Sequence, residues 1–303
     1  MYKENLYMDV NFELYKVFYY VAKHLSFSAA ANELYISQSA VSQAVKLLEE
    51  KLNTKLFFRS TKQVQVTEAG HLLFTHVEQA FHLLKTGERS INELHCLEQG
   101  ELKIGASDTI CKYYLLPYFK QFNQLYPKIK INVTNRPSPV CVDLLKKGLV
   151  DISVVNLAPE RSYPNMNVSK CTLLHDVFIA SHAFIHLQGK VLTLQDIAAL
   201  PVLTLEKNTT TRRFLDSLFA QQNISFQPEI QLGSMDFMME LTKIGLGISF
   251  LSREYIQKEL ADNQLFTLSL TTEIPPRELG IITHDCLPVS LAAQKFIDLL
   301  EVV

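Results

Sequence analysis

The chain has 303 residues, of which 48% are hydrophobic and 20% charged, and its formal net charge is −2. These values are typical of a soluble globular protein, and they exclude a disordered chain, a collagen-like chain and a uniformly cationic nucleic-acid binder. At about 150 residues per domain, the length favours two or three domains.

No export or membrane signal is visible in the sequence. Charged residues interrupt the N-terminal stretch where a signal peptide needs an apolar core, and no run of about 18 apolar residues occurs. The five cysteines are far apart and form no CxxC pair, which argues against a disulfide framework and a cysteine zinc site. We therefore expect a cytoplasmic protein with reduced thiols and no membrane contact. The cysteines are Cys96, Cys111, Cys141, Cys171 and Cys286.

The first 70 residues predict three short helices. Apolar residues recur every three or four positions between residues 14 and 22, which indicates one apolar helical face. Two further helices are expected over Phe27–Leu34 and Ser37–Leu52, with Ser26 and Ser37 placed as their N-caps. The alternating residues 63–67 then predict a hairpin of two short strands.

The second and third helices, joined by a tight turn, fit a helix-turn-helix. In this motif the second helix places its N-terminal turns in the major groove of DNA. Glutamine can bond adenine, serine can bond a base edge or a phosphate, and cations on the hairpin tip can contact phosphates. The candidate DNA contacts are Ser26, Ser37, Gln38, Ser39, Ser42, Gln43, Lys46, Arg59 and Lys62.

Local charge supports this prediction modestly. Seven basic and four acidic side chains between Asn11 and Thr67 leave a local charge of +3, against −2 for the whole chain. For any one of these polar residues the alternative is a solvated surface position without a DNA contact. Their gathering in one unit favours double-stranded DNA as a partner.

Residues 68–98 contain no proline and predict one long helix. Apolar residues follow steps of three and four with one gap at Gly87, a seam that is typical of a helix pair. We expect two chains to pair through this helix, and the alternative is packing on its own domain. The seam consists of Leu73, Val77, Ala80, Leu84, Ile91 and Leu94.

From Gly100 onward, strand and helix patterns alternate, which predicts an α/β module with a parallel sheet and helices on its faces. The pattern restarts near Leu173, so we expect two lobes. Lobe I covers about residues 99–172 and 273–303, and lobe II covers about 173–272.

Hydroxyl-bearing residues follow several predicted strands where a helix begins. Open α/β sheets bind ligands beyond the carboxyl ends of their strands, and free N–H groups at a helix start suit a carboxylate or another anion. Asp108 weakens the case for a strongly anionic ligand, and a plain N-cap is the alternative role for each serine or threonine. The candidate effector-binding residues are Ser107, Asp108, Thr109, Ser138, Asn156, Thr209, Thr210 and Thr211.

Catalytic and metal motifs are missing from the sequence. There is no GxSxG motif and no P-loop, and the pair His182 and His186 has no third ligand, so we expect no enzyme activity, metal or cofactor. Two rival functions remain open: a small-molecule receptor module without DNA binding, and an enzyme that assembles its site from distant residues.

The segment SQSAVSQAVKLLEEKLNTKLFFRSTKQVQVTEAG, preceded by FSAAANELYIS, resembles the N-terminal signature of LysR-type transcriptional regulators, and the later GLGISFLS fits the same family. The resemblance implies a winged helix-turn-helix in residues 1–70, a linker helix in 71–98 and a periplasmic-binding-protein-like effector domain in 99–303. It also implies a homodimer through the linker helix, a tetramer, and a transcription regulator that is modulated by a small molecule between the lobes. Ser39 and Ala44 depart from the proline and glutamine that are usual in the family.

Overall fold

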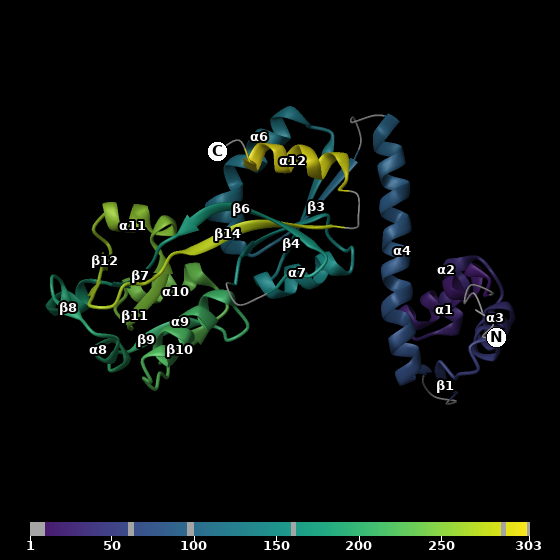
Figure 1. The fold of residues 1–303 in the computed structure, drawn as a ribbon, viewed down its shortest axis with the longest axis horizontal. Coiled ribbons are helices and arrows are strands. Elements are labelled where there is room, and N and C mark those ends of the chain that lie inside the picture. The colour runs from purple at the N-terminus through teal and green to yellow at the C-terminus, as the bar shows by residue number, and fades with distance from the viewer. Residues whose placement is uncertain (1–9, 60–63, 96–99, 159–161, 286–288, 302–303) are drawn as a thin grey trace, which may run out of the picture. The chain divides into compact units, whose positions relative to one another are not determined.

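The computed structural model describes the chain as two compact units, Met1–Thr86 and Gly87–Val303, which are treated separately below (Figure 1). The described residues are 10–59, 64–95, 100–158, 162–285 and 289–301. In these residues no helix combines the length and hydrophobicity that a membrane span requires.

The first unit begins with three helices, as predicted. They are α1 (Phe12–His24), α2 (Phe27–Leu34) and α3 (Gln38–Lys51). The side chains of Ser26 and Ser37 accept hydrogen bonds from backbone N–H groups and cap α2 and α3. An antiparallel pair, β1 (Phe57–Arg59) and β2 (Val64–Val66), follows and leads into α4 (Glu68–His95).

Helical spacing determines the core of this unit. Val41, Val45 and Leu48 lie on one face of α3 and are buried against α1, where Phe18 is fully buried. The Phe18 ring contacts the ring of Phe57 on β1, with 5.5 Å between their centroids. The core thereby holds α3 and the hairpin in one rigid unit.

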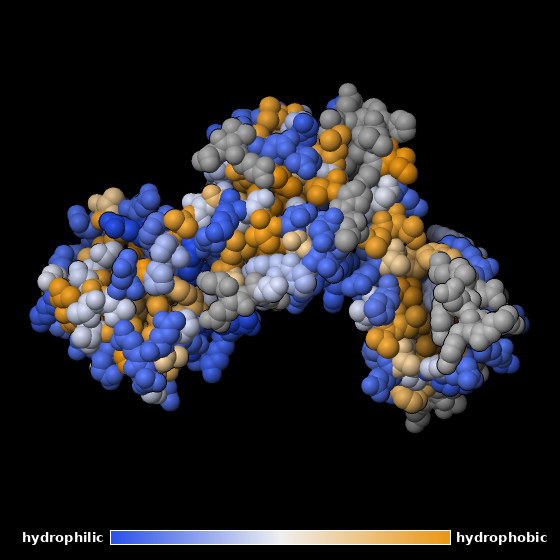
Figure 2. Space-filling view, viewed as in Figure 1, coloured by the Kyte–Doolittle hydropathy of each residue, from blue (hydrophilic) through white to orange (hydrophobic). Residues whose placement is uncertain are grey.

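The first half of α4 also packs on this core. Val77 is buried there, and Leu73, Phe74 and Phe81 pack around it. The first part of the predicted apolar seam therefore packs on its own unit, as the alternative to pairing between two chains had proposed. The second part does not pack there. Leu84 and Ile91 are 51% and 58% exposed, and apolar side chains line this part of α4 in Figure 2. The side chain of Leu94 lies outside the described part of the chain.

The second unit contains two five-stranded sheets. The first has the order β4-β3-β5-β14-β6, and the second has the order β10-β9-β11-β7-β12. Strands of the first sheet are β3 (Gly100–Ala106), β4 (Ile129–Asn135), β5 (Ile152–Asn156), β6 (Met166–Leu174) and β14 (Arg277–His284). Strands of the second are β7 (Asp176–Ala180), β9 (Val202–Leu205), β10 (Ile230–Leu232), β11 (Ile248–Ser252) and β12 (Phe266–Thr267). A small pair is formed by β8 (Val191–Leu192) and β13 (Ser269–Leu270).

Helices connect these strands. The longer ones are α6 (Leu116–Leu125), α7 (Ser138–Lys146), α9 (Thr210–Gln221), α10 (Met235–Lys243) and α12 (Leu291–Glu301). The shorter ones are α5 (Asp108–Ile110), a π-helical turn (Cys111–Leu115), α8 (Leu194–Ala198), α11 (Gln257–Ala261) and the 3-10 helices His182–Leu187 and Arg253–Tyr255.

The prediction of a parallel sheet is wrong in part, because both sheets are mixed. β3 pairs with β4 and β5 in parallel, whereas β14 runs antiparallel to β5 and β6, and β7 runs antiparallel to β11. The physical reason is that the chain crosses between the sheets twice. It passes from β6 to β7 through His175 alone, and it returns at Arg277 as a strand that runs against its neighbours.

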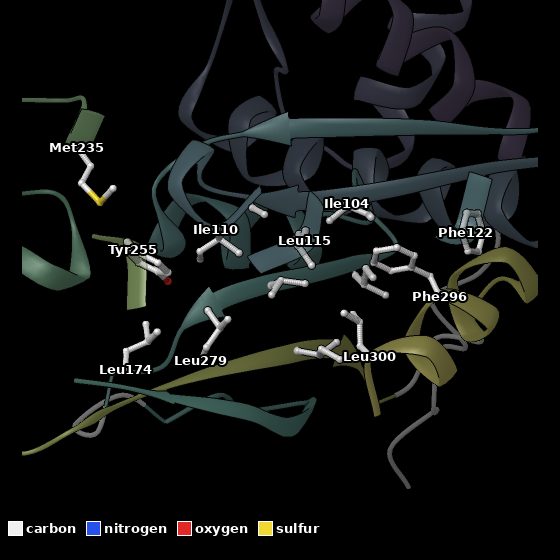
Figure 3. Packing of buried hydrophobic residues seen from close by; sticks show 14 of the residues in the cluster. Ile104, Ile110, Leu115, Phe122, Leu174, Met235, Tyr255, Leu279, Phe296 and Leu300 are labelled. Atoms are coloured by element: carbon white, nitrogen blue, oxygen red, sulfur yellow. The ribbon is translucent and has the colours of Figure 1, made fainter. Parts of the chain in front are cut away.

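Buried side chains join the two lobes of this unit (Figure 3). Phe122 and Phe296 meet edge to face under the first sheet, with 5.3 Å between their ring centroids. Met235 and Tyr255, which come from the second lobe, belong to the same buried cluster as Ile110. This shared core positions the inner ends of the strands, where the candidate effector residues lie.

Candidate functional site

The exposed face of α3 carries most of the predicted DNA contacts. Opposite its buried face, Ser42, Gln43 and Lys46 are exposed, and Lys46 lies 3.6 Å from Glu50, one helical turn further along. A partner on the same helix leaves the Lys46 ammonium at the surface, where it can exchange this carboxylate for a phosphate.

Hydrogen bonds of the candidate DNA-binding residues hold the N-terminal turn of α3. The Ser37 hydroxyl accepts from the backbone N–H of Ala40 (3.2 Å) and lies 2.9 Å from the Ser39 hydroxyl. The Gln38 amide oxygen accepts from Ser28 of α2 at 3.2 Å. These contacts orient the polar side chains before any ligand arrives.

Three other predicted DNA contacts have different surroundings. Ser26 is half-buried, and its hydroxyl accepts from the backbone N–H of Ala29 (3.2 Å), so a helix cap already explains it. Arg59 ends β1, and Lys62 lies outside the described residues.

Tyr35 is an exposed residue of this surface that the sequence analysis missed. It lies in the turn between α2 and α3, its side chain is 95% exposed, and its backbone has a φ of 56°. A left-handed conformation is unfavourable by about 1–2 kcal/mol for a residue other than glycine. An aromatic residue in the turn of a predicted helix-turn-helix was the signal that could have identified it.

A buried carboxylate connects α3 to the hairpin. Glu49 is 3% exposed, and its carboxylate accepts hydrogen bonds from the backbone N–H groups of Leu56 (2.9 Å) and Phe57 (3.3 Å) and from the Lys55 ammonium (2.8 Å). Burial alone would raise the pKa of Glu49, but the hydrogen bonds outweigh burial and hold that pKa below its ordinary value. Glu49 thereby determines where β1 begins relative to α3.

In the second unit, all eight predicted effector residues line one cavity of about 240 Å³, called here the polar cavity. They come from the ends of strands in both sheets and from the first turns of the helices that follow. These residues are Ser107, Asp108, Thr109, Ser138, Asn156, Thr209, Thr210 and Thr211. The search for hydroxyl-bearing residues between the end of a predicted strand and the start of the next helix therefore found residues of one common cavity.

Several of these hydroxyls also have the simpler role that was weighed against ligand binding. Ser107 accepts from the N–H of Ile110 (3.4 Å), and Thr209 accepts from the N–H of Arg212 (3.2 Å). Ser138 is not a cap, since its hydroxyl accepts from the backbone N–H of Asn156 on β5 at 3.1 Å. Ser107 and Ser138 keep their own O–H to donate, whereas the Thr209 hydroxyl already donates to the Glu206 carbonyl at 2.9 Å.

An ion pair links the two lobes at the edge of the polar cavity. Asp236 of α10 accepts from the Lys112 ammonium (2.8 Å) and from the Tyr113 hydroxyl (2.6 Å), both on the π-helical turn. Burial opposes ionisation of Asp236, but hydrogen bonds from Lys112 and Tyr113 lower its pKa overall. The hydrogen bond to Asp236 in turn raises the pKa of Lys112 to about 12. The Asp236 carboxylate is therefore ionised, and the Lys112 ammonium balances its charge.

Tyr255 is a cavity residue that no sequence pattern indicated. Its ring stacks on Tyr113 with 5.1 Å between centroids, and its hydroxyl is buried with no hydrogen-bond partner among the described residues. Ser234 and Ser252 were missed as well, although Ser252 ends β11 and the search for hydroxyls at strand ends would have found it. Strand β10, which precedes Ser234, is too short to be recognised from its pattern.

No metal centre emerges from the described residues, since none of them form a group of three metal-ligating side chains. His182 and His186 lie on a 3-10 helix, where residues four apart do not share one face as they do on an α-helix. Cys111, Cys141 and Cys171 are not in disulfides, and Cys96 and Cys286 lie outside the described residues. Burial raises the pKa of the Cys111 thiol to about 12, which disfavours a nucleophilic thiolate beside the cavity.

Two family models match the chain. The model described as "Bacterial regulatory helix-turn-helix protein, lysR family" matches residues 12–71, and the model described as "LysR substrate binding domain" matches residues 96–303. The first match contains α3 and the hairpin, and the second contains every residue that lines the polar cavity.

Relatives and solved structures agree with these matches. The probable RuBisCO transcriptional regulator of Trieres chinensis is 31% identical over 262 residues, covering 83% of this chain and 82% of the relative. The protein of the same name from Cyanidioschyzon merolae is 30% identical over 287 residues, covering 93% and 94%. ArgP from Mycobacterium tuberculosis has a TM-score of 0.71 at 19% identity, covering 95% of both chains. CbnR in complex with its target DNA has a TM-score of 0.64 at 18% identity, covering 96% of this chain and 99% of CbnR.

Proposed function

The chain belongs to the LysR family of DNA-binding transcriptional regulators, and we propose that the exposed face of α3 reads its DNA site while the polar cavity holds its small-molecule effector. The convergence of the predicted effector residues on one interlobe cavity is the observation that carries the effector half of this proposal. For the DNA half it is the polar, fully exposed face of α3 opposite a buried apolar face.

We propose that bases are read by Gln38, Ser39, Ser42 and Gln43, and that Lys46 contacts a phosphate. Glutamine and serine offer both donors and acceptors to base edges in the major groove, and a lysine there adds sequence-independent attraction. Ser26 and Ser37 at the helix starts, with Arg59 and Lys62 near the hairpin tip, would contact the flanking backbone. Tyr35 is added to this set because its side chain is exposed and it lies in the turn that leads into α3.

We propose that two chains pair through α4, whose exposed Leu84 and Ile91 need an apolar partner, and that two such dimers form a tetramer. A two-fold dimer matches a DNA site with two half-sites. In this arrangement residues 1–70 bind DNA, 71–98 link the chains and 99–303 bind the effector. Lobe II covers about residues 173–272, and the rest of the effector domain forms lobe I. DNA binding further implies a cytoplasmic location with the chromosome.

We propose that the effector is a small polar molecule, with a carboxylate or another anionic group, bound without chemical conversion. Nine of the lining residues carry hydroxyls, Arg136 lines the cavity, and of its two carboxylates Asp236 is paired with Lys112 while Asp108 opposes an anion. The buried Tyr255 hydroxyl needs a hydrogen-bond partner, which a bound ligand would supply. Ligand contacts with both lobes would change their relative orientation and so the arrangement of the DNA-binding units.

Selection of genomic DNA fragments by the purified full chain at about 150 mM salt tests the DNA half, because this salt suppresses non-specific phosphate binding. We expect enrichment of a dyad-symmetric site upstream of a few genes, which identifies the targets, with RuBisCO genes as candidates from the relatives' names. A folded dimer that enriches no sequence, with or without a panel of small organic acids, would refute the proposal. A ligand from that panel that changes neither footprint nor transcription would refute the effector half.

Two substitutions on α3 should have different signatures. Gln43→Ala removes a base contact, and we expect binding to the selected site to weaken by about 1–3 kcal/mol, with relaxed preference at one position. Lys46→Gln removes a phosphate contact, so all sequences should bind more weakly and the slope of log K against log salt should fall by about 1. Lys16→Gln is the matched control, because Lys16 also pairs with a glutamate on its own helix but lies on α1. Equal salt slopes for all three variants and wild type would contradict the assignment of Lys46.

Two stacked tyrosines at the polar cavity should respond oppositely to loss of the hydroxyl. Tyr255→Phe removes a buried group without a partner, and we expect the free energy of unfolding to rise by about 1 kcal/mol. Tyr113→Phe removes a hydrogen bond to Asp236, and we expect a decrease of about 1–2 kcal/mol. Urea denaturation of both variants measures the difference. A destabilised Tyr255→Phe variant would show that its hydroxyl has a partner in the ligand-free protein.

A further inference from the structure

A second cavity of about 410 Å³ adjoins the polar cavity and is the larger of the two. The two cavities share Ser138, Asn156 and Thr210, and six of the fourteen residues that line the second one are apolar, from α7, α9 and the loops at the ends of β5 and β13. We call it the apolar compartment, and its apolar lining consists of Pro139, Val142, Leu157, Ala158, Phe214 and Pro275.

A buried guanidinium with one nitrogen that lacks an acceptor among the described residues borders the apolar compartment. Arg277 is 2% exposed, and its Nε and Nη2 atoms donate to the Asp176 carboxylate, the second at 2.7 Å. Its Nη1 atom is buried and finds no acceptor among the described residues. A buried donor on a charged group without an acceptor is unfavourable, so this atom favours an incoming acceptor.

The remaining polar groups fit an anion as well. Arg213 also lines the compartment, whereas no aspartate or glutamate does so within the described part of the chain. The Tyr163 hydroxyl accepts from the backbone N–H of Ala158 at 3.1 Å and keeps its own proton to donate. The side-chain oxygen of Asn156, at the boundary with the polar cavity, is buried without a partner. Apolar side chains therefore form part of the wall, and the charged side chains that line it in the described part of the chain are cationic.

We propose that the apolar compartment is a second binding site, for a monocarboxylate with an apolar body. Its carboxylate would accept hydrogen bonds from Arg277 and Arg213, and its apolar body would lie against Val142, Leu157 and Phe214. Charge-assisted bonds to a guanidinium supply orientation, and burial of the apolar body supplies most of the affinity. This site goes beyond the hydroxyl-lined polar cavity, and its occupation is measured without DNA, so its failure would leave the proposed function intact.

Isothermal titration of the full chain with three probes tests this site. Octanoate has both the anion and the apolar body, 1-octanol has the body alone, and acetate has the anion alone. We expect octanoate to bind. 1-Octanol should bind at least about tenfold more weakly, because it lacks the charge-assisted hydrogen bonds to the guanidinium groups. Acetate should also bind at least about tenfold more weakly, because it lacks the apolar body. Absence of octanoate binding, or equal binding of 1-octanol, would overturn the proposal.

Variants locate the binding. Arg213→Gln should weaken octanoate binding about tenfold, while Arg253→Gln, an exposed arginine of the same lobe that lines neither cavity, should leave it unchanged. Ser217→Phe places a ring in the compartment from α9 and should abolish binding, with circular dichroism confirming that the variant is folded. Wild-type affinity in both Arg213→Gln and Ser217→Phe would place the octanoate elsewhere and refute the site.

Discussion

Replacement of Asp176 by alanine is expected to lower the free energy of unfolding of the effector-binding unit by about 3–5 kcal/mol. Asp176 of β7 and Arg277 of β14 lie 101 residues apart in sequence and form a buried pair at the crossing between the sheets. Their side chains are 0% and 2% exposed. Removal of the carboxylate leaves a buried guanidinium that still donates a hydrogen bond to Ser252, at 3.2 Å. Urea denaturation followed by far-UV circular dichroism measures the loss.

The double variant Asp176→Leu with Arg277→Met distinguishes the cost of an unpaired buried charge from the contribution of the ion pair itself. Removal of both charges eliminates the desolvation penalty, so we expect the double variant to recover most of the stability that the single variant loses. The same double variant should bind octanoate about tenfold more weakly, because it lacks the Arg277 guanidinium that borders the apolar compartment. A loss below about 1 kcal/mol in Asp176→Ala would mean that water reaches Arg277, contrary to its burial.

Glu49→Ala is expected to destabilise the DNA-binding unit by about 2–4 kcal/mol, because it leaves the N–H groups of Leu56 and Phe57 buried without an acceptor. The hairpin that begins at Phe57 would lose its attachment to α3, so specific DNA binding should disappear at temperatures where the wild type still binds. Thermal denaturation and DNA titration measure the two effects. Glu50→Ala is the matched control, because this neighbouring carboxylate is exposed and should change stability by less than about 0.5 kcal/mol.

The same carboxylate should make stability depend on pH. The pKa of Glu49 is lower in the folded protein than its ordinary value of 4.5, so the unfolded chain binds the proton more tightly. The contribution of Glu49 is therefore complete above that value and is lost as the pH falls through its folded-state pKa. Glu49→Gln, which keeps one acceptor oxygen, should show a smaller loss of stability on acidification than the wild type. Parallel acid profiles would contradict this role.

Local sequence determined the helix-turn-helix nearly to the residue. Ser26 and Ser37 stand directly before apolar helical patterns, and a side-chain cap depends only on atoms within three residues. The same locality explains the polar cavity. A strand that ends at a hydroxyl-rich helix start delivers that hydroxyl to the carboxyl edge of a sheet, so Ser107 and Thr209 line the same cavity although they lie 102 positions apart.

Tertiary structure decided what depends on partners distant in sequence. Glu49 stands beside Glu50 and looks like surface charge in the sequence, yet only Glu49 is buried, because the hairpin folds back over it. The antiparallel strands β7 and β14 follow from two crossings between lobes that no periodicity records.

The division between the two cavities likewise depends on residues that are distant in sequence. Arg277 begins a strand and Tyr255 ends a short helix, and neither position carries a local signal for ligand binding. Their unpartnered polar atoms arise only when burial removes water and the packed neighbours supply no replacement. Sequence by itself therefore determined the caps, the exposed face of α3 and the hydroxyls at the ends of strands, since each rests on contacts within a few residues. The mixed sheets, the buried pair of Asp176 and Arg277 and the apolar compartment were decided by long-range packing, which sequence periodicity does not encode.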